Sequence, residues 1–144
     1  MTSVETQQKF EQFLAERMPV LVQFAQALGS PEPHRILNEP HLFSRGISDW
    51  LSNQVVGSSD RVWLVTRLGY FVGEYLVMRY GGAWFVNEAP TSRYFGRYVV
   101  GHFGRLANSN ALADPFEVAM AAVEPNAQSL EELLAEVSHA LEIA

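Results

Sequence analysis

The longest hydrophobic pattern in the chain runs from Ser58 to Tyr80 and ends at the helix breaker Gly81-Gly82. Apolar side chains fall almost all the way round a helix of this sequence. Asp60, Arg67 and Glu74 recur every seven residues, which places them on one narrow stripe. Because a helix with no hydrophilic face must be surrounded by the rest of the protein, we predict a buried central helix over residues 59–80.

The charged stripe of this helix has two interpretations. A buried carboxylate is costly without a partner, so Glu74 needs a donor from Tyr70, from an arginine elsewhere, or at the open mouth of a cleft. On the first interpretation the stripe is structural, either an ion pair or a solvated groove. On the second it is a surface that faces a ligand or a partner. On the second interpretation the cleft is lined by Arg67, Tyr70, Glu74 and Arg79.

Gly69 and Gly73 lie four residues apart in the same helix. Glycine lowers helix propensity, so its presence here needs a reason. The two glycines leave a smooth patch where another backbone can approach, and we interpret them as sites of close packing.

Amphipathic spacing predicts a first helix at the N-terminal end. It begins at the capping-box pattern of Thr2 and Glu5 and stops at Gly29 and Pro31. Pro19 removes a backbone hydrogen bond inside this helix, which predicts a kink or a restart.

Residues 30–44 are predicted to form an ordered loop, and a short second helix from Ile47 to Val55 follows it, closed by Gly57. The loop contains a small apolar plug made of Ile36, Leu37, Leu42 and Phe43.

Two more helices are predicted in the C-terminal third. Asp114 and Pro115 form a cap and first position for a helix that ends before Pro125. A second capping box, from Ser129 to Glu132, opens an amphipathic last helix. We expect this last helix to cover the core.

Between these helices the hydrophobic period changes to two. Residues 83–88 and 94–103 are rich in aromatic and β-branched side chains, which predicts an antiparallel hairpin with a turn over residues 89–93. Gly96 and Gly101 predict bulges or a close backbone approach. A two-stranded ribbon is marginal alone, so it must lie on helices or pair its edge with another chain, which allows a homodimer. The chain is thus predicted to be a single α+β domain over residues 1–144, with about five helices around the central one.

Composition and charge narrow the classes of partner. The net charge of −6 and the pI near 5.1 argue against a general nucleic-acid or membrane-surface binder. Between Arg61 and Arg105 there are six arginines and only two acidic residues, which makes the centre of the sequence locally basic. Such a region suits an acidic partner or an anionic ligand. The alternative is that these arginines are dispersed over the surface and simply solvated. There are no cysteines, no signal-peptide pattern and no apolar run near the ~20 residues that span a bilayer, so we predict a soluble cytoplasmic protein.

No catalytic residue, metal site or cofactor is predicted. Nucleophile motifs are missing, and the four histidines have no recognised metal-ligand spacing. The hairpin instead carries a set of aromatic and basic side chains suited to stacking on a base or to a protein hot spot. These residues are Arg93, Tyr94, Arg97, Tyr98 and His102. The acidic composition favours a protein partner over nucleic acid, and ordinary packing of a twisted hairpin is the alternative.

Residues 68–76, 79–84 and 114–118 (LGYFVGEYL, RYGGAW and DPFEV) resemble a set of small bacterial domains of unknown function. In these domains an "lGxYlGE" helix leads through "Gg-x-W" into a strand, and a "dPf" helix follows. Some of them look like immunity or accessory proteins of bacterial toxin and secretion systems. The resemblance implies a bacterial α+β domain without established enzyme activity, whose partner is a toxin, an effector or a secretion component.

The leading hypothesis is therefore a non-enzymatic protein-binding module that acts through its hairpin and the Glu74 stripe. The alternative is a small-molecule binder or enzyme with a cleft around Arg67, Tyr70 and Glu74.

Overall fold

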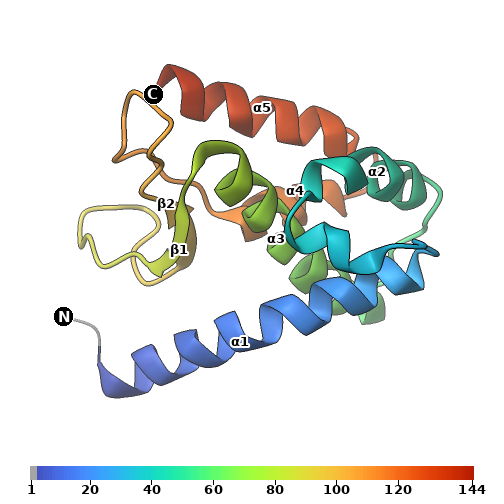
Figure 1. The fold of residues 1–144 in the computed structure, drawn as a ribbon, viewed down its shortest axis with the longest axis horizontal. Helices are drawn as coiled ribbons and strands as arrows, with labels where there is room; N and C mark the ends of the chain where they lie inside the picture. Colours follow the sequence, from blue (N-terminus) through green and yellow to red (C-terminus); the bar gives the residue numbers. More distant parts are fainter. Residues whose placement is uncertain (1–2) are drawn as a thin grey trace.

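Helix α3 (Ser58–Tyr80) lies at the centre of the computed structural model, which describes residues 3–144 (Figure 1). Leu68, Phe71 and Leu76 are completely buried, as expected for a helix enclosed by the protein. The helix ends at Gly81, whose φ of 68° gives the left-handed cap that glycine adopts without strain. The first turns are less enclosed, because Val62 and Trp63 are 76% and 44% exposed.

Four more α-helices surround α3, which confirms the predicted α+β domain. Figure 1 shows α1 and α5 on opposite sides of α3, while α4 packs against both α3 and α5. Two short 3₁₀ helices, η1 and η2, connect α1 to α2. No helix between residues 3 and 144 combines the length and the hydropathy needed to cross a membrane. The bounds are α1 Val4–Ala27, η1 Pro33–Leu37, η2 Pro40–Phe43, α2 Ser44–Ser52, α4 Pro115–Ala122 and α5 Leu130–Ile143.

Helix α1 differs from its prediction in one respect. It continues unbroken through Pro19, so the predicted restart does not occur. The cap is the Ser3 hydroxyl, which accepts a hydrogen bond from the Thr6 amide, while Thr2 of the predicted capping box lies outside the described residues. The end of the helix is as predicted, with Gly29 at φ 86°.

The segment after α1 is more helical than predicted. Ile36 is completely buried in the plug, but Leu42 is 52% exposed and does not contribute to it. Helix α2 begins and ends earlier than expected, and Val55, at 98% exposure, lies beyond its end.

The hairpin strands are shorter than predicted. Strand β1 (Ala83–Val86) pairs antiparallel with β2 (Tyr98–Gly101), in a register that places Trp84 opposite Val100. Residues 87–97 connect the two strands and are called the β1–β2 loop below. An isolated bridge between Val100 and Ala113 brings a third segment to the outer edge of β2.

The two glycines of α3 are sites of close packing, against aromatic rings rather than another backbone. A Cβ on Gly69 would lie 2.2 Å from a ring carbon of Phe116, and a Cβ on Gly73 would lie 1.8 Å from a ring carbon of Trp84. Both rings also contact Phe13 of α1, with centroid distances of 5.9 and 5.1 Å. The glycines thus let α1, β1 and α4 meet on one face of α3.

The predicted caps of α4 and α5 are confirmed. The Asp114 carboxylate accepts hydrogen bonds from the amides of Phe116 and Glu117, and the Ser129 hydroxyl accepts one from the Glu132 amide.

Candidate functional site

Glu74 lies inside the fold rather than on an open face. Its residue is only 6% exposed, and its Oε1 is 2.9 Å from Nε of Arg17 in α1. The Arg17 N–H does not point at the oxygen, so the contact is an ion pair rather than a directed hydrogen bond. The indole of Trp84 donates to the same oxygen at 3.3 Å. Of the two interpretations of the stripe, these contacts favour the structural ion pair with an arginine from another element.

The environment of Glu74 opposes its ionisation. Burial raises the pKa of the carboxyl above its ordinary value, while the Arg17 charge and the Trp84 hydrogen bond lower it and compensate only in part. The folded protein therefore holds a proton on Glu74 more tightly than the unfolded chain does. Its stability should fall as the pH rises from the ordinary carboxyl range through the raised pKa of Glu74.

Replacing Glu74 with glutamine should remove this pH dependence. Urea unfolding of wild type and Glu74→Gln, measured from pH about 4 to about 7, should show the wild type losing free energy of unfolding relative to the variant as the pH rises. Glu11→Gln, which removes one exposed charge on α1, controls for the general loss of a carboxylate. A constant difference between wild type and Glu74→Gln over this range would contradict the raised pKa.

The other residues predicted to line a cleft on α3 make separate contacts. The Tyr70 hydroxyl donates to the Phe13 carbonyl at 3.0 Å, and burial raises its pKa to about 12. The Arg67 guanidinium lies 4.1 Å from the centroid of the Trp63 ring. Arg79 is about three helical turns from Arg67 and contacts tyrosine hydroxyls near the end of α3. These four residues are not brought together around one space.

The β1–β2 loop is held in one shape by hydrogen bonds within it. Asn87 is 4% exposed, and its side chain accepts from the Ala89 amide at 3.3 Å and donates to the Ser92 hydroxyl at 3.0 Å. Across the base of the loop, the Gly96 amide donates to the Asn87 carbonyl at 2.7 Å, and the Asn87 amide donates to the Arg97 carbonyl at 2.9 Å. Sequence reasoning missed Asn87, although an Asn directly after a strand is a known turn signal.

Three of the five predicted hairpin residues meet on this loop. The guanidinium groups of Arg93 and Arg97 lie over the Tyr94 ring, 4.5 and 5.5 Å from its centroid. Two carboxylates complete the cluster, one from the N-cap residue of α4 and one from its first turn, and sequence reasoning did not connect them to it. Arg93 pairs with Glu117 at 2.9 Å, and Arg97 pairs with Asp114 at 3.1 Å. These charges fix the loop against the first turn of α4.

Tyr98 and His102 lie elsewhere. The Tyr98 ring packs against Phe10 and Phe13 of α1, at centroid distances of 5.3 and 4.6 Å. His102 follows the end of β2 with φ 54°, and its ring lies 4.2 Å from that of Phe85. In place of these two, the loop exposes Phe95, a side chain that is 58% accessible to solvent.

Three of the six arginines in the locally basic centre of the sequence pair with carboxylates of α4 or of the residues that flank it. Arg61 pairs with Glu124, and Arg93 and Arg97 pair with Glu117 and Asp114 as described. Residues 106–144, by contrast, contain seven carboxylates and neither Lys nor Arg. The four glutamates of α5 have no Lys or Arg within 4.0 Å in the part of the chain that the structure describes. The face formed by α4 and α5 is therefore acidic.

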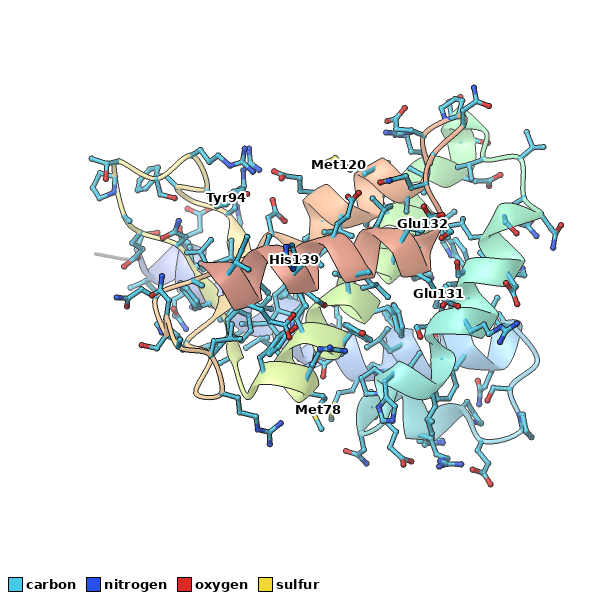
Figure 2. The ribbon with its side chains drawn as sticks, turned by 90° about the horizontal axis from the view of Figure 1, so that it is seen from above. Met78, Tyr94, Met120, Glu131, Glu132 and His139 are labelled. Atoms are coloured by element: carbon cyan, nitrogen blue, oxygen red, sulfur yellow. The ribbon has the colours of Figure 1, made fainter. Side chains whose placement is uncertain are left out.

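A groove of about 450 Å³ runs between α4 and α5 and begins at the β1–β2 loop. Its walls include Val118, Ala121 and Val137, while Tyr94 lies at one end and Glu136 lines one side. Figure 2 shows Tyr94 and Met120 on this side of α5, with His139 on the outer surface of the helix. The arrangement joins an apolar floor, the carboxylate of Glu136 and the β1–β2 loop with its exposed Phe95.

Among residues 3–144, no group of three or more His, Asp or Glu side chains is arranged to hold a metal ion. Comparison with protein-family models, with curated proteins and with solved structures finds no match for this chain.

Proposed function

We propose that this protein is a non-enzymatic, cytoplasmic protein-binding module of the immunity or secretion-accessory type. Its recognition surface is the β1–β2 loop together with the α4–α5 groove. The observation that carries the proposal is Phe95, which is 58% exposed on a loop whose shape is fixed by Asn87 and by the charge pairs to α4. Exposed aromatic and arginine side chains on a rigid support are typical of binding hot spots.

The rigidity of the loop supports a role in binding. Ordering a flexible loop on association costs free energy, and a loop that is already ordered avoids that cost. The bonds of Asn87 and the stacking of Arg93 and Arg97 on Tyr94 hold the loop in place before any partner arrives. Phe95 is then free to enter a pocket on the partner.

The charge of the surface indicates the chemistry of the partner. Asp114, Glu117 and Glu136 line the groove against a single arginine, Arg93, so the groove carries a net negative charge. A complementary partner carries Lys or Arg side chains beside an apolar patch, because opposite charges speed association and favour the correct orientation. We therefore expect a toxin, effector or secretion component with a basic docking segment. This basic partner differs from the sequence-based expectation, in which the arginine-rich centre of the chain suits an acidic partner.

Affinity capture from the native bacterial lysate tests the proposal. The tagged wild-type protein should retain one stoichiometric protein, and Phe95→Ser should reduce that capture at least about tenfold, as expected when a hot-spot side chain is removed. Val55→Ser is the matched control, since Val55 is 98% exposed on the segment between α2 and α3, at the opposite end of the molecule from the loop (Figure 1).

Capture by wild type and Val55→Ser should also weaken when salt is raised, because exposed charge pairs are screened. Equal retention of the same protein by wild type and Phe95→Ser would contradict the proposed surface.

A further inference from the structure

Arg79 is held in an unusual way near the C-terminal end of α3. Its Nε donates to the Tyr80 hydroxyl at 3.0 Å and its Nη1 donates to the Tyr75 hydroxyl at 3.1 Å. Seven of the ten Lys and Arg residues lie within 4.0 Å of a carboxylate, but Arg79 is not among them. Two neutral oxygens thus orient this guanidinium without neutralising its charge.

Arg79 lines a hollow of about 250 Å³ between α3 and α5, on the side of α5 where Figure 2 shows Met78. The Nη2 group of Arg79 donates to no atom of residues 3–144, and the Tyr75 hydroxyl has no acceptor there for its own proton. Ser138 also lines this hollow, and its buried hydroxyl makes no hydrogen bond to any atom of residues 3–144, in a residue that is only 4% exposed.

Of these groups only the Ser138 hydroxyl is buried, and a buried polar group without a partner is rare in folded proteins, a bound ligand being one explanation. The three donors of Arg79, Tyr75 and Ser138 suit an oxyanion, and the planar guanidinium suits a carboxylate in particular. The hollow is not purely cationic, however, because two glutamates of α5, Glu131 and Glu142, also line it. Glu142 lies one helical turn beyond Ser138 on α5, lines the same space, and has no Lys or Arg partner among the described residues.

We propose that this hollow binds a free amino acid. Its carboxylate is held by Arg79, Tyr75 and Ser138, and its ammonium group by Glu142. A simple anion would be repelled by Glu131 and Glu142, and Arg79 opposes the binding of a simple cation, whereas a zwitterion pairs with groups of both signs. The site is separated from the α4–α5 groove by α5 itself and does not depend on the protein-binding role.

Titration with the common L-amino acids, tested singly at millimolar concentration, tests this site. At least one should raise the melting temperature and shift the amide resonances of Tyr75 and Ser138 in a saturable way. Its amide, which lacks the carboxylate, and its N-acetyl derivative, which lacks the ammonium group, should each bind about tenfold more weakly or worse. Inorganic phosphate should not compete.

Arg79→Gln should weaken binding of that amino acid about tenfold or more, since a hydrogen-bonded ion pair is lost. Ser138→Ala removes a hydroxyl that has no hydrogen-bond partner among residues 3–144, so it should leave folding intact and weaken binding of the amino acid severalfold. Arg67→Gln is the control, because Arg67 lies on the same helix without a carboxylate partner and stacks on Trp63 away from the hollow. Binding that is unchanged in Arg79→Gln, binding of phosphate alone, or no response to any amino acid would overturn the proposal.

Discussion

Replacing Gly73 with alanine should destabilise the fold by about 3 kcal/mol, at the upper end of the range for overpacking. The new methyl would lie 1.8 Å from Cζ2 and 2.5 Å from Cη2 of Trp84. Neither group can move freely, because α3 is enclosed and the Trp84 indole packs against Phe13 while donating to Glu74. Urea unfolding followed by far-ultraviolet circular dichroism measures the loss.

Gly46→Ala is the matched control for this prediction. Gly46 lies inside α2, and a Cβ there would have no atom within 4 Å. Since alanine is the better helix former, Gly46→Ala should increase the free energy of unfolding by about 0.5–1 kcal/mol. If Gly73→Ala were as stable as Gly46→Ala, this result would contradict the close packing of the Trp84 ring on Gly73 of α3.

Removal of Arg17 should have the second largest effect. Arg17→Met leaves the Glu74 carboxylate buried with the Trp84 indole as its remaining donor, and we expect a loss of about 3 kcal/mol at neutral pH. This is the low end of the range for broken buried pairs, because the Arg17 side chain is itself 24% exposed and water can partly replace it. Chemical denaturation at constant pH measures the change.

A double-mutant cycle measures the interaction free energy between Arg17 and Glu74 separately from the contacts that each makes with other residues. Arg17→Met combined with Glu74→Leu should recover most of the lost stability, since no uncompensated charge then remains. Arg45→Met is the surface control, because the Arg45–Asp49 pair is 4.0 Å long and largely exposed and should contribute less than about 0.5 kcal/mol. Equal effects of Arg17→Met and Arg45→Met would show that the Glu74 pair is not structural.

Features set by neighbouring residues could be predicted from the sequence. The bounds of α3 follow from a continuous apolar pattern and from Gly81, and the start of α4 follows from Asp114 and Pro115. Each of these signals acts within one helical turn, so no knowledge of the tertiary fold is needed.

The length of β2 and the continuity of α1 could not be predicted in this way. Alternating aromatic residues from Tyr94 onward favour a strand, but the side chains of Asn87 and Ser92 bond to nearby backbone amides and hold a loop instead. Helix α1 passes through Pro19 with residues on both sides packed into the core, including Phe10 and Leu21. The free energy gained by packing these residues into the core exceeds the local cost of a proline inside the helix.

The candidate site was only partly predictable, because its contacts join distant parts of the chain. The requirement that Glu74 find a donor was evident from burial, but nothing local identifies Arg17 as that donor. Likewise Arg93 and Arg97 were predicted to share a surface, whereas their partners on α4 became visible only in the fold. Tyr98 was separated from them because β2 directs its ring toward α1.

In the proposed function the β1–β2 loop, and not the Glu74 stripe, recognises the partner. Side-by-side affinity capture with Phe95→Ser and Glu74→Gln tests it most directly, provided that both variants retain the wild-type circular dichroism spectrum. We expect Phe95→Ser to lose the captured protein and Glu74→Gln to retain it at the wild-type level, because Glu74 is 6% exposed and Phe95 is 58% exposed. Loss of the partner by Glu74→Gln, with full retention by Phe95→Ser, would contradict it.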